Sequence, residues 1–194
     1  MFGAGGCAPF IDIDMGFHYI HGVRLRCYER TSDSYHNLLK NNSIKNVFLS
    51  FSANGYLDPK VDFIDLRGEI DFNMDRGKAV LEGILRTVTI AQTNGKRVFI
   101  IEDFPDVSFT FFTRCLAERN NFDNSIGCLN LQSIDSRYSK ILDELQSYGV
   151  EVIRTEHLLS RFPYTNKGDL MYRDGTHLSE SGSYYFGDNL KIKD

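Results

Sequence analysis

The chain has 194 residues, of which 42% are hydrophobic and 13% aromatic, so we expect a single domain over residues 1–194 with a sizeable core. A formal net charge of -4 leaves no basic surface for a phosphate backbone, which excludes nucleic acid as the expected partner. The sequence has no apolar run of about 18 residues, so no transmembrane segment is predicted within it.

Three apolar runs along the chain predict buried strands. Residues 46–51 and 97–103 are continuous apolar runs that end in small or acidic residues, as buried parallel strands do. Residues 150–155 form the third run. Helical stretches separate these runs, and this alternation predicts an α/β architecture with a mainly parallel sheet.

Two amphipathic helices are predicted between the strands. In residues 75–95 one helical face carries the apolar residues Val80, Leu81, Ile84, Leu85, Val88 and Ala91. Asn94 and Gly95 are a stop signal for this helix. In residues 133–149 the corresponding residues are Tyr138, Ile141, Leu142 and Leu145, with Gly149 expected just past the helix end.

Polar residues after the first strand are candidates for chemistry, because ligands of open α/β sheets bind at the carboxyl ends of the strands. Ser50 and Ser52 lie near that end, but neither is expected on the sharp strand-to-helix turn of a nucleophile. Asn54 is a candidate hydrogen-bond donor to an oxyanion, and Ser52 a candidate substrate contact. The alternative interpretation of Asn54 is an Asn-Gly turn with Gly55.

The segment Met-Tyr-Arg-Asp-Gly-Thr-His-Leu-Ser near the end of the chain follows a short extended stretch at residues 169–172 and leads into a helix starting near Ser179. Asp174 precedes His177 by three residues. A histidine that acts as general base needs one ring nitrogen held by an acceptor, which a carboxylate in a tight turn supplies. The spacing alone also suits a polar turn at Gly175 with His177 on the surface.

The four cysteines have no Cys-x-x-Cys spacing, which excludes a zinc ribbon and leaves two disulfides or four thiols. If Cys7 pairs with Cys27 and Cys115 with Cys128, each bond closes a short loop and contributes roughly 3 kcal/mol in the loop-entropy model. The alternative is buried, reduced cysteine. No metal site and no cofactor are predicted.

Four blocks in order resemble the SGNH domains attached to bacterial membrane acyltransferases. The final block, residues 172–182, is similar to the family pattern Y-R-D-x-x-H-L-S-x-x-G. Residues 5–10 with Cys27 resemble its Cys-x-Pro segment and second cysteine, residues 47–56 its V-x-L-S-A-R-W-x-x-Y strand, and residues 98–115 its strand, proline and cysteine run.

The resemblance implies a three-layer αβα fold, flavodoxin-like in its mainly parallel sheet, and a Ser-His-Asp triad in which Asp174 and His177 are the last two members. It further implies transfer or hydrolysis of an acyl group, usually acetyl, on a cell-envelope glycan, with the acyl group passed from a membrane acyltransferase domain. Such a domain lies on the periplasmic or outer face of a bacterial membrane, which favours disulfides for the four cysteines.

Two departures from the family pattern give two hypotheses. The chain has no Gly-Asp-Ser, the block that follows the family's first strand and holds its nucleophile, and Ser52 and Ala53 replace the Arg-Trp pair. One hypothesis is that the chain is the C-terminal portion of a longer domain, with the first strand and the serine upstream. The other is a glycan-binding pseudoenzyme that has lost turnover.

Overall fold

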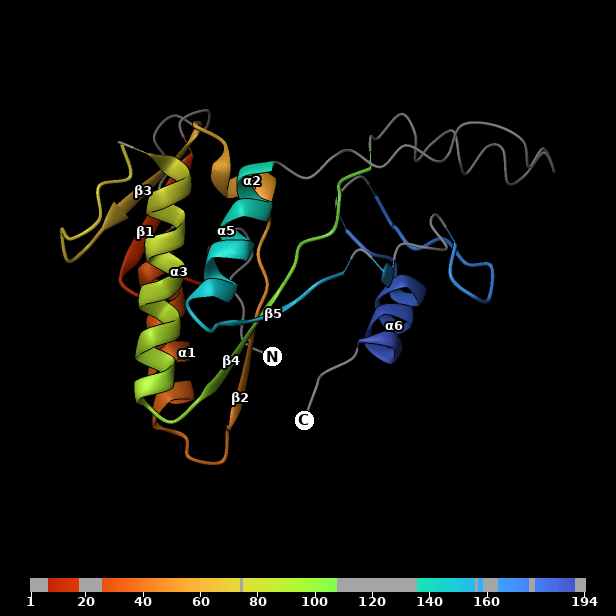
Figure 1. The fold of residues 1–194 in the computed structure, drawn as a ribbon, viewed down its shortest axis with the longest axis horizontal. Coiled ribbons are helices and arrows are strands. Elements are labelled where there is room, and N and C mark those ends of the chain that lie inside the picture. Colours follow the sequence, from red (N-terminus) through yellow and green to blue (C-terminus); the bar gives the residue numbers. More distant parts are fainter. Residues whose placement is uncertain are drawn as a thin grey trace. The chain divides into compact units, whose positions relative to one another are not determined.

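The computed structural model describes residues 7–17, 26–73, 75–107, 136–155, 157–158, 164–174 and 177–190. The chain divides into two compact units (Figure 1). The first comprises Met1–Asp103 and Asp135–Val152, and the second comprises Phe104–Ile134 and Ile153–Asp194.

A three-stranded sheet forms the centre of the first unit. Its strands in spatial order are β2 (Asn46–Leu49), β4 (Arg97–Ile101) and β5 (Glu151–Ile153), which continues one residue past the unit boundary. β2 and β4 are parallel, with Asn46 opposite Arg97 and Leu49 opposite Ile100. All three predicted strands are therefore confirmed, and so is the α/β class with a parallel pairing.

Two helices, α3 (Arg76–Thr93) and α5 (Ser136–Ser147), lie side by side in the first unit (Figure 1). α5 buries the four residues predicted for its apolar face: Tyr138, Ile141, Leu142 and Leu145. α3 buries five of the six predicted positions and leaves Leu85 half-buried. Because burial of an apolar face is the main source of helix stability in proteins, the apolar pattern was sufficient to place both helices.

The ends of these helices follow from their capping residues. The Asp75 carboxylate accepts a hydrogen bond from the Lys78 amide at 3.1 Å and caps the start of α3. Gly95 and Gly149 follow the two helices with φ angles of 73° and 78°, the left-handed conformation that glycine adopts without a steric penalty. Both predicted helix stops are confirmed.

A second, antiparallel pair of strands was not predicted. β1 (Ile13–Phe17) pairs with β3 (Val61–Asp65), and α1 (Cys27–Lys40) contacts β1. Both strands alternate apolar and acidic residues, as in Ile13-Asp14-Met15 and Val61-Asp62-Phe63, which is the signature of a half-buried strand. The prediction of a mainly parallel sheet holds for the three-stranded sheet and misses this antiparallel pair.

One disulfide lies among the described residues. Cys7 is bonded to Cys27, the first residue of α1, with a Cα–Cα distance of 5.5 Å. Cys27 is buried at 1% exposure, so the bond joins the start of the described chain to the core. This pairing is confirmed, and the predicted partners Cys115 and Cys128 lie outside the described residues.

The second unit is built around a small apolar cluster and the C-terminal helix α6 (Glu180–Asn189). The cluster consists of buried Val107, Met171 and Tyr172, with Phe104, Leu178 and Tyr185 packed against it. Ser179 caps α6 as predicted, because its hydroxyl accepts from the Gly182 amide at 2.9 Å. Of the helices in the described part of the chain, none has the length and apolarity needed to cross a bilayer.

Candidate functional site

Asp174 and His177 lie on a narrow antiparallel turn in the second unit. Tyr172 and Leu178 form an antiparallel bridge, and the Arg173 amide donates to the His177 carbonyl at 2.8 Å. The backbone therefore closes a short loop from Arg173 to His177. We refer to residues 171–174 and 177–179 as the two limbs of the C-terminal hairpin.

The Asp174 carboxylate holds both the ring and the backbone of His177. Nδ1 of His177 lies 2.9 Å from Oδ1 and 3.0 Å from Oδ2 of Asp174. The His177 amide also donates to Oδ1 at 2.8 Å. An ionised carboxylate only accepts hydrogen bonds, so Nδ1 carries the proton and Nε2 is the basic nitrogen of the neutral ring. This is the tautomer that a general base requires.

The pair is accessible to solvent. The side chains of His177 and Asp174 are 64% and 37% exposed. Arg173, whose side chain is 68% exposed, places its Nε 3.5 Å from Oδ2 of Asp174. A reacting molecule can therefore reach the imidazole, while water screens the charges around it.

Ser52 and Asn54 lie at the start of a short helix, which corrects one prediction. β2 ends at Leu49, and Ser52 is the N-cap of α2 (Ala53–Leu57). The Ser52 hydroxyl accepts from the Gly55 amide at 3.3 Å and caps the helix. The alternative of an Asn54-Gly55 turn is wrong, because capping by Ser52 draws both residues into α2.

The predicted site residues thus fall into two groups. Asp174 and His177 are brought together in the second unit, whereas Ser52 and Asn54 belong to the first. The side chain of Asn54 lies outside the described part of the chain. The role of Ser52 and Asn54 toward an oxyanion or substrate stays a prediction.

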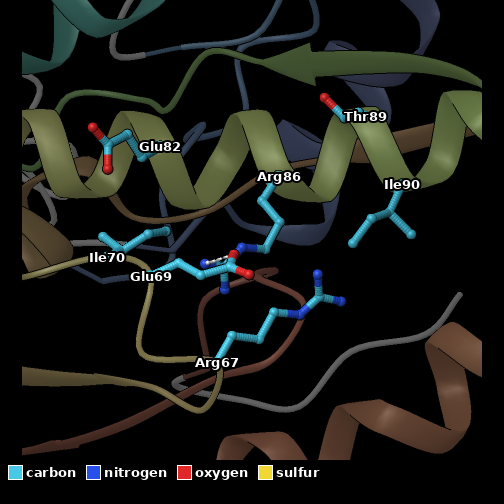
Figure 2. Close-up of a pocket in the computed structure, with 7 residues that line it drawn as sticks. All are labelled: Arg67, Glu69, Ile70, Glu82, Arg86, Thr89 and Ile90. Atoms are coloured by element: carbon cyan, nitrogen blue, oxygen red, sulfur yellow. Dashed lines mark hydrogen bonds and ion pairs between the residues drawn. The ribbon is translucent and has the colours of Figure 1, made fainter.

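The first unit has a cavity of about 410 Å³ beside α3 (Figure 2). It is lined by Arg67, Glu69, Ile70, Glu82, Arg86, Thr89 and Ile90, and none of the predicted site residues is among them. Figure 2 shows Arg86 reaching from α3 toward Glu69, which lies 3.0 Å from its Nη2. Arg67 binds Asp12 through Nε at 2.6 Å. Both arginines of the cavity are therefore engaged by carboxylates of the fold.

Asp65 is the buried centre of this ion network. Its two oxygens accept from Arg86 Nη1 and Nη2 at 2.6 and 2.7 Å, and the side chains are 1% and 9% exposed. The amides of Arg67, Glu69 and Ile70 donate to the same carboxylate. The Arg86 guanidinium holds the pKa of Asp65 well below its usual range, and Asp65 in turn raises the pKa of Arg86. The network fixes the loop after β3 to α3.

An α/β fold with a parallel sheet hosts many unrelated functions, so the Asp174–His177 pair is the informative feature, and a histidine held by a carboxylate occurs in many acyl-transfer enzymes and esterases. Residues 1–191 match the family described as SGNH domain (fused to AT3 domains), and the chain belongs to that family. The resemblance seen in the four sequence blocks is confirmed. It places the chain in a family of hydrolases and acyltransferases.

A solved structure shares the fold. The periplasmic domain of a lipopolysaccharide acetyltransferase from Salmonella ser. Paratyphi A matches with a TM-score of 0.60 at 15% sequence identity. The match covers 92% of this chain and 65% of that one. No curated protein matches the sequence.

Proposed function

We propose that the chain is part of an enzyme that transfers or hydrolyses an acyl group, usually acetyl, on a hydroxyl of a cell-envelope polysaccharide. His177 is the general base, and Asp174 orients it. The observation that carries the proposal is the 2.9 Å contact between Nδ1 of His177 and Oδ1 of Asp174. Membership of the SGNH family supports the reaction class.

In the proposed reaction a serine hydroxyl attacks the acyl carbonyl of the donor while Nε2 of His177 takes its proton. The donor's leaving group departs with that proton, and an acyl-serine ester remains. A sugar hydroxyl then attacks the ester and gives its proton to the same nitrogen, from which the serine recovers it. Asp174 stabilises the imidazolium in both steps. When water replaces the sugar hydroxyl, the outcome is hydrolysis.

In this proposal the nucleophilic serine lies outside these 194 residues, because they contain no Gly-Asp-Ser. Within the described residues β2 pairs on one side only, with β4, and Phe48 on β2 is 41% exposed. A further strand beside β2 would pair its open edge and cover this ring, at the strand that leads to Ser52. This open edge supports a nucleophile strand next to β2.

The acyl donor in this proposal is supplied by a membrane acyltransferase domain, and the acceptor is a glycan. The domain then lies on the periplasmic or outer face of a bacterial membrane, tethered through that upstream domain. Fusion of the family's domains to AT3 domains supports the donor. The fold shared with the periplasmic domain of a lipopolysaccharide acetyltransferase supports the location and the glycan.

The test uses the natural polypeptide that carries residues 1–194 and measures acetate release from an acetyl ester and acetyl transfer to polysaccharide. Removal of a general base typically costs 10²-fold or more, so His177→Ala should lower the rate by at least about 100-fold. Asp174→Asn should also lower it, because an amide no longer fixes the tautomer. The control is His36→Ala on the exposed face of α1, which should leave the rate unchanged. An unchanged rate in His177→Ala contradicts the proposal.

A second candidate function is a glycan-binding module without turnover, favoured by the absence of Gly-Asp-Ser. It predicts saturable polysaccharide binding, no acetate release from the natural polypeptide, and binding that His177→Ala leaves intact. Acetate release that depends on His177 excludes it.

A further inference from the structure

The base of the C-terminal hairpin is closed by one serine. The Ser179 amide donates to the Met171 carbonyl at 2.8 Å, and the Ser179 hydroxyl donates to the Leu170 carbonyl at 2.5 Å. The same hydroxyl accepts from the Gly182 amide at 2.9 Å. Ser179 therefore joins the two limbs of the hairpin and ties both to the first turn of α6.

Gly182 allows α6 to approach the other limb of the hairpin. A Cβ at this position would lie 2.8 and 2.9 Å from the carbonyl carbon and Cα of Met171, and closer still to the carbonyl oxygen. These are backbone atoms, so a side chain cannot rotate away to relieve the overlap. Any larger residue would have to move α6 or the hairpin by about 1 Å.

The limb that Gly182 touches is itself fixed. Met171 and Tyr172 are 3% and 4% exposed, and the Tyr172 hydroxyl donates to the Pro105 carbonyl at 2.7 Å. A change at Gly182 therefore shifts α6 together with the limb that carries Leu178 and His177. That shift changes the distance between Nδ1 of His177 and the Asp174 carboxylate, because Asp174 belongs to the fixed limb.

We propose that Ser179 and Gly182 are positioning residues, which hold the two limbs of the hairpin at the spacing that brings His177 Nδ1 to the Asp174 carboxylate. The inference rests on the proposed function for its consequence in catalysis. Its structural part, the geometry of the Asp174–His177 contact, can be tested without any turnover.

The structural arm compares two alanine variants in the same helix of the natural polypeptide. Gly182→Ala meets the Met171 backbone, whereas a Cβ at Gly187 meets nothing within 4 Å, so Gly187→Ala is the matched control. The readouts are the ¹⁵N NMR signal of protonated His177 Nδ1, read through the carbon-bound ring protons, which do not exchange with water, and assigned by its loss in His177→Ala, together with hydrogen exchange of the Ser179 amide. We expect Gly182→Ala to lose the signal and exchange faster at Ser179, with Gly187→Ala unchanged. Retention of both in folded Gly182→Ala overturns the proposal.

A second pair of variants decides the matter if Gly182→Ala does not fold. Ser179→Ala removes the hydroxyl that bonds Leu170 and Gly182, and Ser179→Thr restores it. Loss of the His177 signal in the alanine variant and its recovery in the threonine variant support positioning. Equal spectra for Ser179→Ala and wild type overturn it.

The kinetic arm measures kcat and KM for acetyl transfer. Misplacement of a catalytic group by about 1 Å costs up to 10²-fold, so we expect kcat to fall at least about tenfold with little change in KM. If Gly182→Ala loses the His177 signal but keeps the wild-type kcat, the proposed role of Gly182 in catalysis is overturned. Absence of turnover in the wild type, with the NMR result as expected, instead rejects the proposed function and leaves the hairpin geometry supported.

Discussion

Replacing Asp65 by asparagine should produce a large loss of stability, because it leaves Arg86 charged in a buried setting. The two side chains are 1% and 9% exposed and share two hydrogen bonds of 2.6 and 2.7 Å. Removal of one partner of a buried ion pair typically costs about 3 to 5 kcal/mol. Glu69 still lies 3.0 Å from Nη2, and asparagine keeps one acceptor for the backbone amides, so we expect the lower end, about 3 kcal/mol.

Thermal and urea unfolding, followed by circular dichroism, measure this loss. For a chain of this size a loss of about 3 kcal/mol lowers Tm by roughly 6 to 12 °C. The control is Glu151→Gln, which breaks the pair with Arg97 at 2.6 Å, where both side chains are 42% exposed. An exposed pair contributes about 0 to 1 kcal/mol. Equal losses in the two variants would refute the assignment of Asp65 as a buried anchor.

The pH dependence of the free energy of unfolding is a second test of the Asp65–Arg86 ion pair. Arg86 lowers the folded-state pKa of Asp65 below the ordinary value of about 3.9, so the unfolded chain binds the proton more readily. The stabilisation is complete above the unfolded pKa and is lost as pH falls toward the folded pKa. The stability gap between wild type and Asp65→Asn should therefore narrow below about pH 4. A gap that stays constant down to about pH 2 would contradict this.

Two further predictions concern the anchors of the chain. Tyr172→Phe leaves the Pro105 carbonyl without its 2.7 Å partner in a buried cluster, so it should lower the free energy of unfolding by about 1 to 2 kcal/mol, measured by urea unfolding. Tyr148→Phe, at a side chain that is 62% exposed, is the control, and an equal effect would contradict the prediction. Replacing Cys7 and Cys27 by serine removes a disulfide between residues 20 positions apart. The free energy of unfolding should fall by roughly 3 kcal/mol. Under reducing conditions the wild type and the double variant should have equal stability, and a wild type insensitive to full reduction would argue against a stabilising bond.

The strands and helices that the sequence predicted are those with a continuous apolar run or a repeated apolar helical face. In α5 all four predicted core residues are buried, because a helix of 12 residues repeats its pattern over several turns. β1 and β3 are as long as the predicted strands, but aspartates interrupt their apolar residues, so neither forms a continuous apolar run. Their pairing also joins segments about 50 residues apart, which local periodicity does not reveal.

Some features of the candidate site could likewise be predicted from neighbouring residues, and others depend on how distant segments pack. The Asp174–His177 contact spans three residues in a turn, so spacing and the motif were enough to predict it. The Asn54-Gly55 turn was predicted wrongly because this dipeptide is typical of turns, whereas here both residues lie in the short helix α2 that Ser52 caps. Gly182 belongs to the recognised motif, yet its packing against Met171 depends on where α6 docks, which only the tertiary structure gives.

The exposure of Asp174 and His177 explains why their geometry needs support from the backbone. A hydrogen bond between side chains that are 37% and 64% exposed contributes only about 1 kcal/mol, less than the entropy of holding two side chains in a fixed pose. The carboxylate therefore selects the tautomer of His177 but does not by itself fix the position of the ring. The backbone bond from Arg173 to the His177 carbonyl, the Ser179 bonds and the close approach of Gly182 supply the missing restraint. In this hairpin the backbone contacts fix the geometry, and the exposed side chains carry the chemistry that we propose for them.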